Sequence, residues 1–275
     1  MAWREIMTHI IITLALMTSS ILANAQESLN FGIVPQQSAS KLAQLWGPIF
    51  KYLEKETGIK IHFETAPNIP TFEARLAAGK YDLSYMNPYH YVVFSKNPGY
   101  EAFSKARNKR IKGIIVVRKD SPIEQLDDLS HSTLAFPAPA AFAASILTRS
   151  ALTEAAVNFT PKYVSSHDSV YRGVAKGIYL AGGGINRTLS NMAPEIREQL
   201  KILWTSTGYT PHALAAHPRV ETRKVKKIQK ALIDMKNNPR GNALLKKINI
   251  NGFELGTDAE WNDVRSLNLN LIKLD

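Results

Sequence analysis

The chain has 275 residues with 34 Lys and Arg against 23 Asp and Glu, a formal net charge of +11, and it contains no cysteine. Without cysteine the sequence excludes a disulfide framework, a thiolate metal site, a cysteine nucleophile and a lipid-modified cysteine. Because the basic residues are spread out and aromatics are not interleaved with them, the charge predicts attraction of small anions and no nucleic-acid partner.

The N-terminal segment has the pattern of an export signal. Ile10 to Met17 is a largely apolar run that is too short for a permanent membrane anchor, and small and polar residues follow it. Ala23-Asn24-Ala25 then supplies the small-x-small pattern that signal peptidase reads. We therefore predict a signal peptide at 1–25, cleavage after Ala25 and a periplasmic mature protein; a buried N-terminal helix is the alternative.

From Leu29 onward, short apolar runs alternate with amphipathic segments, the rhythm of an α/β fold with a mostly parallel sheet. Strands are predicted at 29–34, 60–65, 82–86, 112–117, 133–136, around Tyr163, at 178–181 and at 202–205. Helices are predicted from a cap at Ser38 or Ser40 to Gly58, then at 71–78, 140–152, 168–176, 221–236 and 242–247.

The order of these elements predicts two αβ lobes with a ligand cleft between them. The middle third forms its own αβ unit, whereas the stretch after 205 reads as mostly helical without comparable strands. We place crossovers near 110–113 and 209–213, so that lobe 1 is 26–111 plus 212–275 and lobe 2 is 112–211.

The best catalytic candidate is the run Ser165-Ser166-His167-Asp168-Ser169, which nominally holds a nucleophile, a base and an orienting carboxylate. Adjacent residues rarely converge in space, and no Gly-x-Ser-x-Gly nucleophile elbow occurs in the chain. A helix cap explains these serines as well, so a hydrolase is the weaker interpretation.

Two further motifs carry little chemistry. Gly182-Gly183-Gly184 lacks the Lys-Ser/Thr of a phosphate-binding loop and is read as a tight strand-to-helix turn. The seven histidines show no paired spacing on a common helix face, so the sequence predicts neither a metal site nor a cofactor.

What remains is a set of loops that follow the predicted parallel strands, where open α/β sheets bind ligands. Each loop is rich in small, hydroxyl or amide groups, and each following helix start offers free N–H groups that favour an anion. The loops span 34–40, 66–71, 86–91, 136–142, 165–169, 182–188 and 205–212.

Several segments, taken in order, resemble the phosphonate-type periplasmic binding proteins of ABC transporters. The signatures are Phe31–Gln36, Tyr52–Gly58, Tyr81–Pro88, Val116–Leu129 and Trp204–Pro211. The resemblance covers nearly the whole mature chain and implies a type II periplasmic binding fold, a small anionic ligand, a monomer and an ABC permease as partner.

The resemblance also implies site residues, with departures from the family pattern. It places Tyr91 as a pocket tyrosine and His167 at a helix start near the acid group, but Ala141 and Ala143 stand in a loop where phosphonate binders present hydroxyls. Arg187 and His212 stand where aminophosphonate binders place acids, which favours a second anionic group on the ligand. The ligand-binding candidates are Gln36, Asn68, Tyr89, Tyr91, Ala141, Phe142, Ala143, His167, Asp168, Arg187 and His212.

Two roles fit this chain besides the weaker hydrolase hypothesis. The first is a binding protein that delivers an organic anion to a permease by lobe closure, without covalent chemistry. The second is a periplasmic sensor that docks on a membrane receptor kinase or cyclase when loaded. Phe142 and Tyr89 indicate a flatter or more apolar ligand in either role.

Overall fold

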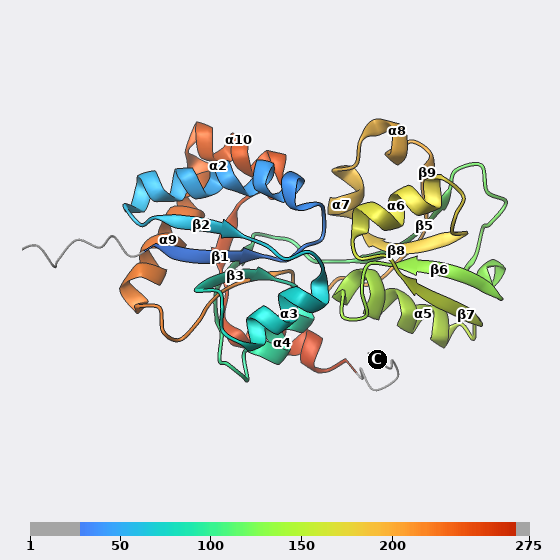
Figure 1. Cartoon of the computed structure of the whole chain (residues 1–275), viewed down its shortest axis with the longest axis horizontal. Helices are drawn as coiled ribbons and strands as arrows, with labels where there is room; N and C mark the ends of the chain where they lie inside the picture. The colour runs from blue at the N-terminus through green and yellow to red at the C-terminus, as the bar shows by residue number, and fades with distance from the viewer. Residues whose placement is uncertain (1–27, 268–275) are drawn as a thin grey trace, which may run out of the picture.

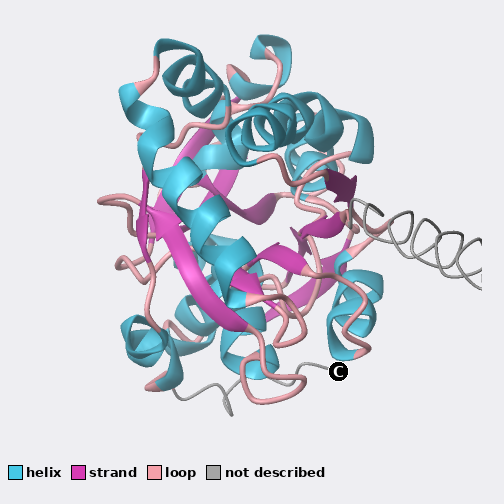
Figure 2. Ribbon diagram, turned by 90° about the vertical axis from the view of Figure 1, so that its left-hand side faces the viewer, coloured by secondary structure: helices cyan, strands magenta, loops and turns pink. Residues whose placement is uncertain are grey.

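The computed structural model describes residues 28–267, so the predicted signal peptide and its cleavage site lie outside the described residues. Two α/β lobes lie side by side along the long axis of the molecule (Figure 1). Each lobe has one sheet with helices on both of its faces, and Figure 2 shows these helices arranged around the strands when the molecule is viewed along its long axis.

The sheet of the first lobe has the strand order β11-β4-β10-β3-β1-β2. The strands β1, β2 and β3 are parallel to one another, whereas β10 runs antiparallel to both β3 and β4. Its strands are β1 (Leu29–Ile33), β2 (Ile61–Glu64), β3 (Leu83–Met86), β4 (Glu101–Ala106), β10 (Ala213–Ala216) and β11 (Phe253–Leu255). Its helices are α2 (Ala39–Thr57), α3 (Ile69–Ala77), α4 (Pro88–Phe94), α9 (Thr222–Asp234), η3 (Met235–Asn237), α10 (Pro239–Lys247), η4 (Asp258–Trp261) and α11 (Asn262–Arg265).

The sheet of the second lobe has the order β7-β6-β8-β5-β9. Its strands are β5 (Gly113–Arg118), β6 (Ser132–Phe136), β7 (Phe159–Tyr163), β8 (Ala181–Ile185) and β9 (Leu200–Thr205). Its helices are η1 (Leu126–Leu129), the π-helical turn η2 (Phe142–Leu147), α5 (Thr148–Glu154), α6 (His167–Ala175), α7 (Asn186–Ser190) and α8 (Pro194–Arg197).

Strand β5 shows why the second lobe needs helices on both faces of its sheet. Successive side chains of a strand point to opposite faces, and every residue from Gly113 to Val117 is buried. Ile114 and Val116 pack with Val170 and Val174 of α6, whereas Ile115 and Val117 pack on the other face with Leu152 of α5. The continuous β-branched run is therefore buried on both faces of the sheet. Because β5 runs antiparallel to β8 and β9 while β6 is parallel to β7 and β8, the sheet is mixed and not mostly parallel as predicted.

Helix α2 confirms the predicted end signals of the first helix. The Ser38 side chain accepts a hydrogen bond from the Lys41 N–H, and Gly58 ends the helix in the left-handed conformation with φ 70°. Its apolar stripe, which includes Leu42, Trp46 and Leu53, is buried against the sheet.

The chain passes between the lobes twice, at 107–112 and at 206–212. Ile111 and Tyr209 exchange reciprocal main-chain hydrogen bonds of 2.8 and 2.9 Å, so the two crossovers are paired as antiparallel strands. This pairing fixes the hinge region between the sheets.

Three predictions on individual strands are wrong. Gly182-Gly183-Gly184 is not a turn but the middle of the buried strand β8. Of the predicted strand 178–181, only Ala181 belongs to β8, whereas 178–180 is irregular and Ile178 is 65% exposed. The region after 205 was predicted without strands, yet β10, with the sequence Ala-Leu-Ala-Ala, lies between β3 and β4. Glycine and alanine carry little strand propensity, so tertiary packing determines that β8 and β10 are strands.

Candidate functional site

The site lies where the lobes meet, and hydrogen bonds between the lobes hold it closed. The His167 N–H, at the start of α6 in the second lobe, donates to the main-chain oxygen of Gln36 in the first lobe at 3.0 Å. The Asn87 side chain at the start of α4 donates to the Ala140 carbonyl oxygen at 3.0 Å. Because each bond joins one lobe to the other, the structure is a closed conformation.

The same loops enclose a small inner cavity of about 10 Å³, enough for roughly one water molecule. Its lining includes Gln36, Asn87, Ala141–Ala144, His167 and His212, and none of the described residues that line it carries a carboxylate. A closed site this small admits a larger ligand only after the lobes separate.

The second lobe contributes main-chain groups to this cavity through η2. Ala141 precedes the turn, and the first N–H groups of a helix have no partner within the helix. With Ala141, Phe142, Ala143 and Ala144 in the lining, this loop offers the cavity main-chain polar groups and no hydroxyl. The hydroxyl of Ser145 is buried without a partner among the described residues, and Ser145 does not line the cavity.

His167 begins α6, and Ser166 caps this helix by accepting a hydrogen bond from the Ser169 N–H at 3.1 Å. The His167 ring is buried, and its Nδ1 pairs with Thr188 Oγ1 at 3.1 Å. Its ring nitrogen therefore pairs with Thr188, while the Ser166 and Ser169 hydroxyls pair with each other at 3.0 Å. The arrangement is a capped helix start, as the alternative interpretation of this run predicted.

A second group of side chains surrounds Arg187 of α7, and we call Gln36, Tyr85, Arg187 and His212 the Arg187 cluster. The Arg187 guanidinium donates to Gln36 Oε1, and its carbon lies 6.0 Å from the centre of the Tyr85 ring. Gln36 Nε2 pairs with His212 Nε2 at 3.0 Å, and the His212 ring stacks on Tyr85 at 4.8 Å. The guanidinium thus reaches the inner cavity through Gln36.

The other predicted site residues lie outside this group. The Tyr91 hydroxyl donates to Asp258 at 2.7 Å, and its ring packs on Trp261. This position does not support a role for Tyr91 in ligand binding. Asn68 caps α3 by accepting from the Thr71 N–H at 2.8 Å, and Tyr89 packs half-buried against the core of the first lobe.

Asp168 lies at the lobe boundary, where its Oδ2 accepts from the Ser38 N–H at 3.5 Å. Burial raises the pKa of this carboxyl above its ordinary value. Its place near a helix start and opposite the first lobe fits a role in closure better than contact with an anion, because like charges repel.

Sequence reasoning missed Tyr85 and Asn87 as parts of the site. Both lie within the stretch Tyr81–Pro88 that carried the family resemblance, at the end of β3 and the start of α4. Tyr85 is the partner of Ile33 in the pairing of β3 with β1, so the two side chains lie on the same face of the sheet. A helix-cap signal at Asn87 was also visible, because Pro88 follows it.

The two buried histidines of the site predict a pH-dependent stability. Burial, and then the positive charge of Arg187, lower the pKa of His167 to about 3 and that of His212 well below its usual range. Below about pH 6.5 the unfolded chain binds protons that the closed protein does not, so stability falls with falling pH. We expect a loss of about 1.4 kcal/mol per pH unit for each histidine between pH 6 and pH 4.5, measured by urea unfolding.

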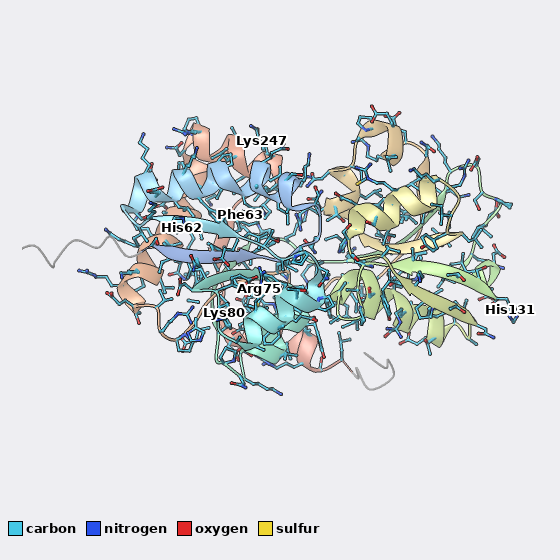
Figure 3. All side chains as sticks on the ribbon, in the orientation of Figure 1. His62, Phe63, Arg75, Lys80, His131 and Lys247 are labelled. Atoms are coloured by element: carbon cyan, nitrogen blue, oxygen red, sulfur yellow. The ribbon has the colours of Figure 1, made fainter. Side chains whose placement is uncertain are left out.

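Replacing His167 by asparagine, which retains a polar atom near Nδ1, should remove one histidine's share of this slope. The exposed His62 on the first lobe (Figure 3) provides the control, because H62Q should leave the slope unchanged. An H167N protein with the wild-type pH dependence would show that His167 is not the group responsible.

Comparison with known proteins decides the family. The family model described as ABC transporter, phosphonate, periplasmic substrate-binding protein matches residues 31–261. The chain belongs to this family. Its members are solute-binding components of ABC importers that are exported to the periplasm, so the family places this chain in transport.

Curated relatives and solved structures agree with the phosphonate-binding family. The phosphonates-binding periplasmic protein of Escherichia coli is 22% identical over 94% of this chain and 81% of its own length. The phosphate-import protein PhnD of Mycolicibacterium smegmatis is 23% identical over 74% of this chain and 70% of its own length.

Among solved structures, PhnD1 of Prochlorococcus marinus in complex with methylphosphonate has a TM-score of 0.82 at 17% identity. That match covers 90% of this chain and 98% of PhnD1. A phosphonate-transporter binding protein from Pseudomonas aeruginosa gives a TM-score of 0.81 at 18% identity, over 90% of this chain and 86% of its own. The fold is thus the two-lobed type II periplasmic binding fold that the sequence predicted.

None of these relatives favours the second predicted role, docking on a membrane receptor. Among residues 28–267, no helix combines the length and apolar character needed to cross a membrane. In the same described range, no three His, Asp or Glu side chains gather in a way that would hold a metal ion.

Proposed function

We propose that this protein captures a small anion with a phosphonate or related acid group between its lobes and presents the closed complex to an ABC permease. The observation that carries the proposal is the lining of the inner cavity, which is formed by the starts of η2 and α6 with Gln36 and His212, and which holds no carboxylate among the described residues. Arg187 donates to Gln36 at the edge of this cavity. The names of the relatives add phosphonates and phosphate as ligand classes.

Binding follows from the contacts that the closed structure already makes. Entry of a ligand requires separation of the His167–Gln36 and Asn87–Ala140 bonds, with movement at the paired crossovers around Ile111 and Tyr209. In the loaded form, a ligand oxygen replaces Gln36 Oε1 as the acceptor for Arg187. The neutral imidazole of His167 stays paired with Thr188 and keeps the start of α6 in place.

The proposed activity involves no covalent step. Of the nucleophile candidates of the hydrolase hypothesis, Ser166 caps α6 and its hydroxyl pairs with that of Ser169, while the His167 Nδ1 pairs with Thr188. We further propose that the mature protein starts at Gln26, acts as a monomer in the periplasm and binds no nucleic acid, as the sequence predicts.

The test is a thermal-shift screen of the protein from residue 26 onward, because a ligand that binds only the folded state raises the unfolding midpoint. At a concentration of one hundred times Kd, a ligand adds about 2.7 kcal/mol, which corresponds to a rise of about 5–10 °C. We expect this rise with methylphosphonate, and a smaller one with 2-aminoethylphosphonate, because Arg187 repels its ammonium group.

Simple carboxylates and sulfonates complete the screen. A rise with carboxylates alone would mean that the lobes were retained while the ligand class changed, as Ala141 and Ala143 would allow. The absence of a rise with every anion tested would contradict the proposed function.

A further inference from the structure

A second, larger cavity of about 180 Å³ lies beside the Arg187 cluster, between the first crossover and α7. The first lobe contributes Lys109 and Arg110, and from the opposite side the second lobe contributes Asn186 and Arg187. We call this space the outer cavity. Because both lobes line it, its shape depends on closure.

The outer cavity is strongly basic. Lys109, Arg110, Lys112 and Arg187 line it, and no carboxylate of the described residues does. Arg110 is engaged by Asp263 at 2.7 Å, whereas Lys109 and Lys112 are exposed and make no ion pair with the described residues. Positive charge without nearby compensation in a partly enclosed space attracts anionic groups.

Amide side chains supplement these cations from both lobes. Asn186 and Asn249 line the outer cavity, and the Asn249 amide donates across the lobe boundary to Asn191 at 2.7 Å. An acid group in this cavity therefore has hydrogen-bond donors and cations available from the two sides of the closing cleft.

The outer and inner cavities share a wall. Ile111, Ile185 and His212 line both of them. Arg187 lines the outer cavity while its guanidinium donates to Gln36, which lines the inner one. Displacement of the Gln36 side chain from Arg187 joins the two spaces, so one ligand of moderate length reaches both.

From this geometry we infer that the ligand is an anion with two acid groups, one in the inner cavity and a second in the outer cavity near Arg187, Lys112 and Lys109. The inference rests on the proposed function, since it assumes that the first acid group binds between the lobes. It names the substrate class as phosphonates that carry a further acid group, such as a carboxylate, a few bonds away. The second group also ties the lobes together in the closed form.

The experiment is calorimetry on the protein from residue 26 onward with two probes, methylphosphonate and 3-phosphonopropionate, which share the phosphonate but differ in the carboxylate. We expect 3-phosphonopropionate to bind at least tenfold more tightly. In Lys112→Met, which keeps the apolar stem and removes the charge, this preference should fall about fivefold, while the methylphosphonate Kd stays within twofold. Lys51→Met, at an exposed position of α2, is the matched control and should keep the full preference.

The outcomes separate the two proposals. Equal affinity for both probes in the wild-type protein would overturn the inference and leave the proposed function standing. A preference that survives both Lys112→Met and the double variant Lys109→Met/Lys112→Met would overturn the assignment to the outer cavity. Failure of both probes to bind would overturn the proposed function together with the inference.

Discussion

Replacing Arg187 by glutamate should weaken the binding of methylphosphonate by at least a hundredfold. The guanidinium is half-buried against Tyr85 and bonded to Gln36 at the edge of the inner cavity. Removing one partner of a buried charge pair costs about 2–5 kcal/mol, and a hundredfold change corresponds to about 2.7 kcal/mol. Charge reversal adds repulsion between the introduced carboxylate and the anion, in a site where no described lining residue carries a carboxylate of its own.

Isothermal calorimetry at low and high salt would measure this change. R187K should retain part of the affinity, because it keeps the charge but loses the planar fork that binds two oxygens. The exposed Arg223 on α9 is the control for charge, and R223E should bind as the wild type does. If R187E binds methylphosphonate with unchanged affinity, Arg187 is not part of the ligand site.

Replacing Gly183 by alanine should lower the free energy of unfolding by about 3 kcal/mol, the upper part of the range for overpacked sites. A Cβ on Gly183 would overlap the carbonyl oxygen of Ala144 and lie 2.8 Å from Phe136 and 2.9 Å from Thr148. The overlapping atom is main chain of η2 and cannot rotate away. For a protein of this size the midpoint should fall by about 6–12 °C.

Gly47, in the middle of α2, gives a matched substitution, because a Cβ there meets nothing within 4 Å among the described residues. G47A should therefore leave the midpoint unchanged or raise it slightly. Since Gly183 sets how closely η2 approaches the sheet, G183A should also weaken anion binding, even at temperatures where the variant is folded. A G183A protein as stable as G47A would show that η2 does not rest on β8 in solution.

Much of the fold was predictable because local signals agreed with tertiary structure. Helix α2 was predictable from its apolar spacing between the Ser38 cap and Gly58, and β5 from its β-branched run. Strand β10 and the glycines of β8 were not predicted as strands because they consist mainly of small residues. Small residues give no periodic pattern of large apolar side chains. Strand β4 was also missed, because its sequence Glu-Ala-Phe-Ser-Lys-Ala has one large apolar residue and no clear alternation.

The candidate site was predictable only in part. Loops at the carboxyl ends of strands led to Gln36, and the family resemblance placed His167, Arg187 and His212. The structure brings these residues together around the inner cavity and its edge. Tyr91 was placed by alignment, and a helix of seven residues turns its side chain toward Trp261 and the C-terminal part of the first lobe. Neither the outer cavity nor its lysines follows from a pattern, because residues distant in the chain meet there only when the lobes close.

The two bonds that join the lobes at the inner cavity both end on a main-chain carbonyl oxygen. The His167 N–H meets the Gln36 carbonyl oxygen, and Asn87 meets the carbonyl oxygen of Ala140. A main-chain donor or acceptor persists when the side chain at its position changes, so substitutions at 36, 140 and 167 leave these groups in place, whereas a substitution of Asn87 removes a donor. Variation at those three positions can therefore change the cargo while both bonds persist, provided that Asn87 is kept.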